Sequence, residues 1–152
     1  MKIRRARDED YAGIARLRRQ TIRAVNSKDY PADVIHSWSA EAGAQRFRES
    51  ADTCKRWVAL DKDRIIGFCE HSLECELTRM YVHPDRLRKG VGSRLLKVAE
   101  ESLKKQGCQE ISLESTLTAK DFYAKNGYQV HKKTLYKGNM NEPIYQMSKR
   151  LG

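Results

Sequence analysis

The chain of 152 residues lacks several features that would assign it to a special class of protein. It has no apolar run near the roughly 20 residues that a membrane-spanning helix needs. Its first eleven residues, MKIRRARDEDY, lack the apolar segment of a secretory signal peptide. We find no internal repeat, linker or low-complexity segment. We therefore expect a single domain over residues 1–152, a cytoplasmic location and no membrane partner.

Cysteines are few and follow no recognisable pattern. The four of them, Cys54, Cys69, Cys75 and Cys108, lack the spacing of a disulfide framework, and we expect them to be reduced. Cys69, His71 and Cys75 could be imagined as metal ligands, but no second pair of ligands stands at zinc-like spacing. The sequence therefore predicts no metal site.

Positive charge is in excess, with 30 lysines and arginines against 20 acidic residues and a formal net charge of +10. Such a charge suits any polyanion, including nucleic acid and a nucleotide cofactor with several phosphates. The basic residues are spread along the chain and form no tail. Because neither a recognition-helix motif nor the paired aromatics of an RNA-binding sheet is present, we expect no nucleic-acid partner.

Residues 76–103 carry the strongest local pattern. A largely buried strand ends at Pro84, and apolar residues recur at helical spacing from Val91 onward. Between them lies a basic turn with Gly90 and Gly92, two glycines that would let a ligand approach the backbone. The free N–H groups of the first helical turn, the helix dipole and the nearby cations describe a phosphate cradle. An ordinary strand-to-helix connection is the alternative.

Two better-known glycine loops do not fit this turn. A P-loop needs a lysine after its last glycine, but Ser93 follows Gly92 directly. A dinucleotide-binding fingerprint needs a third glycine, and Leu95 stands at that position.

The first third of the chain reads as one strand followed by helices. Residues 2–6 suit a strand, Asp8 is expected to cap a helix that runs to about residue 25, and Pro31 opens the first of two shorter helices. One face of the first helix is apolar. The other face should be solvated, and it carries Arg16, Arg18, Arg19 and Arg23.

From residue 56 the pattern becomes that of strands. Strands at 57–60 and 65–69 form a hairpin, and the strand at 76–83 completes a four-stranded meander. After the helix that follows Gly92 we expect a strand at 110–115, a short helix at 117–126 that Gly127 ends, and two last strands at 128–136 and 144–149. This order predicts an α+β fold, with a mixed sheet of about seven strands and helices on both faces.

The basic turn, R-K-G-V-G-S, resembles the pyrophosphate loop of the GNAT acetyltransferases, which reads Q/R-x-x-G-x-G/A. The chain departs from this loop in having Leu87 at the Gln/Arg position. Residues 115–128, S-T-L-T-A-K-D-F-Y-A-K-N-G-Y, are similar to the family's A-x-x-F-Y-x-x-x-G-F/Y. The segment from Tyr30 to Trp38 looks like the substrate-side helices of small bacterial members near the YafP group. Together with the order of elements, the resemblance covers nearly the whole chain.

The resemblance implies a GNAT fold and an N-acetyltransferase that uses acetyl-CoA as donor. The pantetheine arm would follow the edge of the strand that ends in M-Y-V, and the amine would attack directly in a ternary complex, without a covalent enzyme intermediate. The implied cofactor-binding residues are Met80, Tyr81, Val82, Leu87, Arg88, Lys89, Gly90, Val91, Gly92, Ser93, Ser115, Ala119, Phe122 and Tyr123.

Two catalytic candidates follow from the resemblance. Tyr123 stands where the family has its thiol-facing tyrosine and would be the acid for the leaving thiolate; a core aromatic beside Phe122 is the alternative. Glu76 stands eleven residues before Leu87, where some members have a glutamate that activates water, and would be the base. By alternation it shares a strand face with Thr78 and Met80. Its rivals are Glu70, Glu74 and His71, and a strand-end carboxylate without catalytic role is the alternative.

The acceptor site is the least specified part of the chain. In the family it is built from the first helices and the last hairpin, here residues 30–47 and 135–144. The expected substrate-binding residues are Tyr30, His36 and Trp38, an aromatic wall, with the carboxylate of Glu70. We therefore expect a small-molecule amine as the partner. Two alternatives are a peptide as the acceptor and a non-catalytic protein that binds acyl-CoA. The chain could also form a homodimer.

Overall fold

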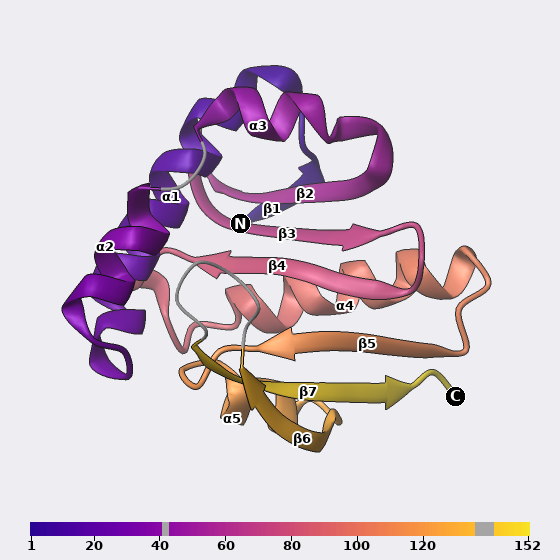
Figure 1. Ribbon diagram of the computed structural model, residues 1–152. Helices are drawn as coiled ribbons and strands as arrows, with labels where there is room; N and C mark the ends of the chain where they lie inside the picture. Colours follow the sequence, from indigo (N-terminus) through magenta and orange to yellow (C-terminus); the bar gives the residue numbers. More distant parts are fainter. Residues whose placement is uncertain (41–42, 136–141) are drawn as a thin grey trace.

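The computed structural model describes residues 1–40, 43–135 and 142–152, and its centre is one mixed sheet of seven strands (Figure 1). The strands lie in the order β1-β2-β3-β4-β5-β7-β6. Strands β4 and β5 run parallel, and the other neighbouring pairs are antiparallel. The predicted α+β fold is confirmed. The strands are β1 (Lys2–Arg5), β2 (Cys54–Asp61), β3 (Arg64–Ser72), β4 (Glu76–Val82), β5 (Glu110–Ser115), β6 (Gln129–Leu135) and β7 (Pro143–Arg150).

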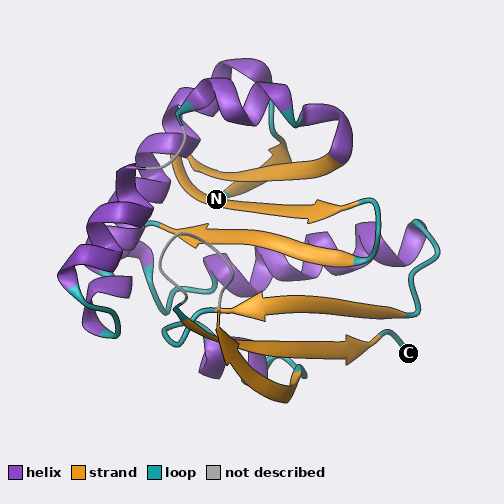
Figure 2. Cartoon of the chain, in the orientation of Figure 1, coloured by secondary structure: helices purple, strands orange, loops and turns teal. Residues whose placement is uncertain are grey.

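Helices cover both faces of the sheet (Figure 2). On one face, α1 (Tyr11–Ala24) and α3 (Ala44–Glu49) pack on β2 and β3 through a cluster that includes Leu17, Phe47 and Phe68. On the other face, α4 (Val91–Lys105) and α5 (Lys120–Lys125) form the larger cluster around Leu95 and Leu103. Helix α2 (Ala32–Ala40) packs against α1. Each face of the sheet is thus buried where a helix lies on it.

Two helices begin later than their sequences predict. A short 3-10 turn, Asp8–Asp10, precedes α1, and the carboxylate of Asp8 accepts a hydrogen bond from Arg48 at 2.9 Å. The carboxylate of Asp10 accepts the N–H of Arg7 at 2.7 Å. The expectation that Asp8 caps the helix is therefore wrong. The short helix after β5 begins at Lys120, because residues 117–119 form a turn.

A β-bulge in β4 changes which side chains share a face. Leu77 pairs with His71, and Arg79 pairs with Glu70, so that Thr78 is one extra residue on β4. The hydroxyl of Thr78 donates to Glu70, whereas Met80 packs in the cluster against α4. The prediction that Thr78 and Met80 share one face is therefore wrong, because the extra residue reverses the alternation.

Two of the four cysteines form a disulfide. Cys75, just before β4, is bonded to Cys108, just before β5, with their Cα atoms 5.7 Å apart. The expectation that all four are reduced is wrong for this pair. The two are 33 residues apart in sequence, and the parallel pairing of β4 with β5 brings them together. Cys54 and Cys69 are free.

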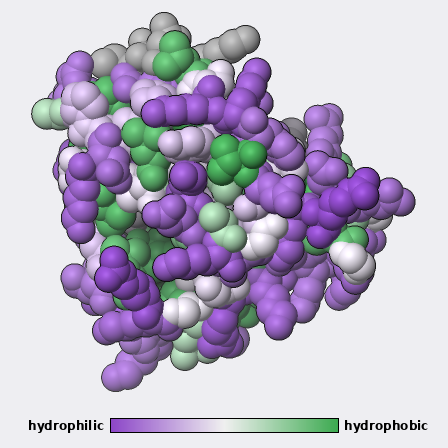
Figure 3. Space-filling view, turned by 90° about the horizontal axis from the view of Figure 1, so that it is seen from below, coloured by the Kyte–Doolittle hydropathy of each residue, from purple (hydrophilic) through white to green (hydrophobic). Residues whose placement is uncertain are grey.

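The exposed edge of the sheet is mostly hydrophilic. Strand β6 is the outermost strand on its side and exposes Val130 and Leu135 at 41% and 56%. Viewed from below Figure 1, hydrophobic residues appear in several groups separated by hydrophilic ones (Figure 3). A homodimer therefore stays a prediction.

Candidate active site

The sheet opens between β4 and β5. In these two strands Glu76 pairs with Ser112 and Leu77 pairs with Leu113, and the pairing of β4 with β5 ends there. The N–H of His83 donates to Ile66 on β3 at 2.8 Å, and backbone groups alternate between the two edges of a strand. The polar backbone groups of Met80 and Val82 therefore face the gap, while those of Tyr81 face β3. The carbonyl of Val82 accepts the hydroxyl of Thr21 at 3.1 Å, and the rest of this edge beyond Leu77 can accept an extended, hydrogen-bonding ligand.

Helix α4 begins at the far end of this edge. Gly90 precedes the helix with φ of +83°, and a Cβ built there meets nothing within 4 Å. The N–H of Arg94 is bonded to Gly90, which leaves the N–H groups of the three residues before Arg94 pointing out of the first turn. Arg88 and Lys89 are exposed and make no ion pair within the described ranges. Arg86 is bound to Asp61 at 2.8 Å. This end of the gap suits a phosphate.

Gly92 has a packing role in addition to the one that its position in the turn predicts. A Cβ at Gly92 would lie 3.2 Å from the ring of Phe122 and 3.5 Å from Val82. The missing side chain therefore lets α4 pack closely on α5 and β4. The space without neighbouring atoms is at Gly90, and the N–H of Gly92 still points out of the first turn of α4.

Tyr123 lies in the core on the α4 side of the gap. Its ring makes edge contacts with Phe122 at 5.2 Å and with Tyr128 at 5.7 Å, and it is 7% exposed. Burial raises the pKa of Tyr123 well above its ordinary value of 10. No hydrogen bond of the Tyr123 hydroxyl is found among the residues that the structure describes. The hydroxyl is thus protonated at neutral pH and available as a donor.

Glu76 stands at the closed end of the gap. Leu77 is buried on the α4 side, so Glu76 beside it points to the opposite face. Burial raises the pKa of Glu76, and the neighbouring carboxylates of Glu114 and Glu74 raise it further. Tyr123 therefore lies on the α4 face of the sheet and Glu76 points to the opposite face, and its raised pKa makes Glu76 a stronger base than an ordinary carboxylate.

Two rivals of Glu76 are occupied by structural contacts. The carboxylate of Glu70 is buried, bound to Arg56 at 2.7 Å and to Arg79 at 3.4 Å. Glu70 therefore cannot serve as the exposed acceptor carboxylate that the sequence suggests. His71 is fully buried, and its ring nitrogens lie 2.8 Å from Ser72 and from Ser102. Burial also lowers the pKa of His71.

Three of the acceptor candidates lie around Tyr30. The rings of Tyr30 and Trp38 meet at 4.6 Å, beside Leu117. His36 lines a pocket of about 310 Å³ between α1 and α2 together with Tyr30 and Arg23. The part of the last hairpin at residues 136–141 lies outside the described residues. Tyr30 thus contacts Trp38 and shares a pocket with His36.

The hydroxyl of Tyr30 joins three segments. It accepts the N–H of Leu117 at 2.8 Å and donates to the carbonyl of Pro143 at 2.8 Å. Tyr30→Phe should therefore lower the free energy of unfolding by about 1–3 kcal/mol, because both backbone groups lose their partner. Chemical denaturation measures this. Tyr145→Phe is the control, since the Tyr145 hydroxyl has no hydrogen bond in the described part of the chain. Equal stability of the two variants would contradict the joining role.

Sequence reasoning missed two polar residues of α1. Arg18 was expected on the solvated face, but it is 6% exposed and donates to the carbonyl of Trp38 at 2.8 Å and to the hydroxyl of Tyr81 at 3.3 Å. The hydroxyl of Thr21 donates to the carbonyl of Val82 at 3.1 Å. The signal was in the spacing, because Arg18 stands four residues after Ile14 and four before Ile22.

Other predicted cofactor residues have structural contacts of their own. The ring of Tyr81 stacks on Phe68 at 6.0 Å, on the α1 side of the sheet. Ser115 is buried and its hydroxyl donates to the carbonyl of Thr116. Ala119 precedes α5, where its N–H donates to the hydroxyl of Thr116. Leu87, Val91 and Ser93 belong to the turn and the first residues of α4.

Among the described residues, no group of three or more His, Cys, Asp or Glu side chains could hold a metal ion. No helix in the same part of the chain is long and apolar enough to cross a membrane.

The sequence resembles known proteins along most of its length. The sequence profile of the acetyltransferase (GNAT) domain matches residues 23–151. The chain is 26% identical over 134 residues to the uncharacterized N-acetyltransferase YafP of Escherichia coli, covering 87% of this chain and 83% of that protein. It is 27% identical over 144 residues to the spermidine N(1)-acetyltransferase of Thermoplasma acidophilum, covering 86% of this chain and 89% of that protein.

The fold resembles solved structures along the whole chain. A GCN5-related N-acetyltransferase from Rhodopseudomonas palustris matches with a TM-score of 0.93 at 22% identity, over 99% of this chain and 95% of that one. The PaiA N-acetyltransferase of Thermoplasma acidophilum, in complex with coenzyme A, matches with a TM-score of 0.80 at 24% identity, over 99% and 98%.

Proposed function

The chain belongs to the GNAT acetyltransferase family, and we propose that it transfers the acetyl group of acetyl-CoA to the primary amine of a small molecule. One observation carries this proposal. Strands β4 and β5 part after Leu77, with Tyr123 on one face of the opening, Glu76 on the other and the start of α4 at its far end. A thioester held in such a gap meets a hydroxyl on one side and a carboxylate on the other.

The donor would bind along β4 by its extended arm. The backbone groups of Met80 and Val82 that face the gap would hold the pantetheine amides, and one backbone N–H there would bind the thioester oxygen as negative charge develops on it. Its pyrophosphate would lie at the first turn of α4 and be neutralised by Arg88 and Lys89. The open edge of β4 and the basic turn before α4 support this mode of binding.

The acceptor must lose a proton before it attacks. An amine with a pKa of about 10.4 is neutral at pH 7 in roughly one molecule in 2,500, which corresponds to about 4.6 kcal/mol. Glu76, whose pKa is raised by burial and by its acidic neighbours, would take this proton directly or through one water. The amine nitrogen then attacks the thioester carbon, the C–S bond breaks and coenzyme A leaves as a thiolate.

Tyr123 would assist the departure of this thiolate. Its raised pKa lies well above that of a thiol, about 8.5, so full transfer of the phenolic proton to the sulfur is unfavourable. The hydroxyl therefore acts by donating a hydrogen bond to the sulfur as negative charge grows there. As the amide forms, its nitrogen loses a second proton, and the thiolate takes up a proton, so that the products are the neutral amide and the thiol of coenzyme A.

A small amine suits the acceptor side of the gap. The half-buried ring of Trp38, which packs on the buried ring of Tyr30, offers an aromatic surface on which a cation can lie. The carboxylates of Glu74, Glu76 and Glu114 lie close enough together to influence one another, and they attract a cationic substrate locally although the chain is basic. The similarity to a spermidine acetyltransferase is in keeping with such an acceptor. The cytoplasmic location stays part of the same proposal.

The phosphate turn gives a quantitative expectation. Arg88→Gln should raise the KM for acetyl-CoA about tenfold or more, because a hydrogen bond to a charged group contributes about 1.5–3 kcal/mol and each 1.4 kcal/mol is tenfold. Steady-state kinetics at saturating amine measures this. The control is Lys105→Gln, an exposed cation at the other end of α4. An equal KM in both variants would remove Arg88 from the donor site.

Calorimetric titration tests the donor claim separately from catalysis. The chain should bind acetyl-CoA with saturation and one-to-one stoichiometry. It should bind duplex DNA only weakly, in a salt-dependent manner that reflects its net charge. Tight DNA binding without acetyl-CoA binding would overturn the proposed function.

A further inference from the structure

The bulge of β4 has a buried anchor, the carboxylate of Glu70 on β3. One oxygen of this carboxylate, Oε1, accepts the hydroxyl of Thr78 at 2.7 Å and lies 3.4 Å from Nε of Arg79. The other oxygen, Oε2, accepts from Arg56 at 2.7 Å. Glu70 is 6% exposed and Arg56 is 5% exposed. Because hydrogen bonds to a buried, ionised carboxylate are short and strong, Thr78 and Arg79 are held firmly against β3.

Thr78 and Arg79 follow each other in sequence, yet both side chains lie on the same face of the sheet. Both reach Glu70, and the guanidinium of Arg79 also lies over the ring of Phe47, 5.3 Å from its centre, on the face that α1 and α3 cover. In a regular strand, successive side chains point to opposite faces. Two residues of β4 therefore stand opposite the single residue Glu70, which is the arrangement of a β-bulge. The contacts of Glu70 thus depend on the bulge and stabilise it.

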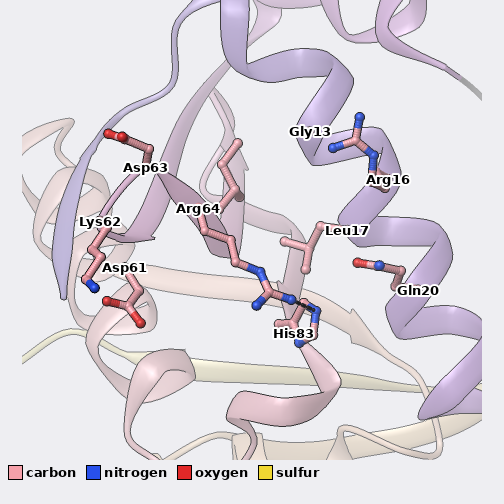
Figure 4. Close-up of a pocket in the computed structure, with 10 residues that line it drawn as sticks. Gly13, Arg16, Leu17, Gln20, Asp61, Lys62, Asp63, Arg64 and His83 are labelled. Carbon is pink, nitrogen blue, oxygen red and sulfur yellow. Dashed lines mark hydrogen bonds between the residues drawn. The ribbon is translucent and has the colours of Figure 1, made fainter.

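Strand β4 is tied to β3 on both sides of the bulge. After the bulge, the imidazole of His83 lies 3.0 Å from the guanidinium of Arg64 at the start of β3 (Figure 4). Before the bulge, Leu77 is paired with β3. The extra residue must therefore be accommodated between Leu77 and His83. Within this stretch, the contacts with Glu70 fix it at Thr78.

The position of the bulge decides which backbone groups of β4 face the gap. The carbonyl of Cys75 accepts an N–H of β5 at 3.1 Å, so in a regular strand the backbone groups of every second residue after Cys75 would face β5. Arg79 and Tyr81 would then face the gap. The extra residue shifts this order by one, and the groups of Met80 and Val82 face the gap instead. A β4 without the bulge would thus present different backbone groups to a donor.

We propose that Glu70 is a positioning residue for acetyl transfer: through Thr78 and Arg79 it holds the bulge that turns other backbone groups into the gap. These are the groups of Met80 and Val82. The inference rests on the proposed function, because those groups are the ones that would bind the pantetheine arm. Glu70 is buried and acts only through the geometry of β4.

The affinity for acetyl-CoA in variants of β4 tests the proposal. Thr78→Val keeps the shape of the side chain and removes only a hydroxyl from an exposed position, so the variant should fold. Calorimetry should show acetyl-CoA binding weakened about fivefold or more, because the apparent affinity falls with the fraction of molecules that keep the bulge. Thr78→Ser, which restores the hydroxyl donor, should bind within about twofold of the wild type. Arg79→Gln, which removes the second contact with Glu70, should weaken binding in the same direction.

A shorter ligand separates this effect from a general loss of structure. The nucleotide half of coenzyme A, a phosphoadenosine diphosphate, has the phosphates but no pantetheine arm, so it should bind Thr78→Val as tightly as the wild type. Thr53→Val is the matched control. The hydroxyl of the exposed Thr53 donates to the carbonyl of Ser50 at 2.8 Å, before β2, which β3 separates from β4. This control should lose similar stability in chemical denaturation and keep its affinity for acetyl-CoA.

Two results would overturn the proposal. One is equal affinity for acetyl-CoA in the wild type, Thr78→Val and Arg79→Gln. The other is an equal loss of affinity for acetyl-CoA and for the nucleotide in Thr78→Val, which would make the contact with Glu70 a support of the fold only. In either case the wild type still binds and turns over acetyl-CoA, so the proposed function stands. A wild type that does not bind acetyl-CoA would instead overturn the proposed function, and this inference with it.

Discussion

Replacing Tyr123 with phenylalanine should lower kcat by about 10²–10⁴-fold, while the affinity for acetyl-CoA changes little. The ring contacts with Phe122 and Tyr128 are kept, so the variant should fold normally. What is lost is the hydroxyl, which has no hydrogen bond within the described residues and would donate to the departing sulfur. Pre-steady-state kinetics at saturating amine, with calorimetric affinity for acetyl-CoA, separates the chemical step from binding.

The neighbouring tyrosine provides a matched control. The hydroxyl of Tyr128 donates to Glu100 at 2.8 Å, a structural contact away from the gap. Tyr128→Phe should therefore be less stable than the wild type. Its kcat should stay within about threefold, since the lost hydrogen bond makes no contact with the reacting atoms. If Tyr123→Phe also kept its kcat, Tyr123 would be a core aromatic without a catalytic role.

Glu76→Gln should have two opposite effects. Because the substitution removes the proposed base, kcat/KM should fall by about 10²–10⁴-fold. In the wild type, the acidic limb of the pH profile should lie above the ordinary carboxyl pKa of 4.5, because burial and the charges of Glu114 and Glu74 raise the pKa of Glu76. This limb should be absent from the variant. Glu74→Gln tests the exposed rival, and loss of the limb there instead would assign the base to Glu74.

The same substitution should stabilise the fold at neutral pH. The folded pKa of Glu76 is raised, so the stability that its protonated form gives is present below pH 4.5 and is lost as pH rises through the folded value. At pH 7 the wild type therefore carries a carboxylate that is less favourable folded than unfolded, and glutamine removes it. Thermal unfolding at pH 7 and at low pH measures the difference. A variant less stable than wild type at pH 7 would contradict the raised pKa.

The sequence predicts the order of elements well because its periodicities are strong. The apolar spacing from Val91 to Leu103 and the boundaries of β5 follow from side-chain pattern alone. The basic turn before α4 and the Phe122-Tyr123 pair could also be found, because each depends on residues adjacent in sequence. These are the features that bring the donor edge, the phosphate turn and the hydroxyl together.

What escaped prediction depends on pairing between distant residues. The bulge at Thr78 is a property of the β3–β4 register, and it alone decides that Met80 turns from the face of Thr78. The Cys75–Cys108 bond requires the parallel approach of β4 and β5. The packing role of Gly92 depends on Phe122, 30 positions later in the chain. Such contacts leave no local periodicity.

Acetylation of a panel of amines, followed by mass spectrometry of the product and by release of coenzyme A, tests the central claim most directly. The panel holds polyamines, aminoglycosides, amino acids and peptides with free N-termini. We predict that a small-molecule amine gives saturable turnover and a product heavier by one acetyl group, and that this turnover is lost in Tyr123→Phe. Activity confined to peptides would contradict the small acceptor. Binding of acetyl-CoA without acetylation of any amine would contradict the enzyme itself.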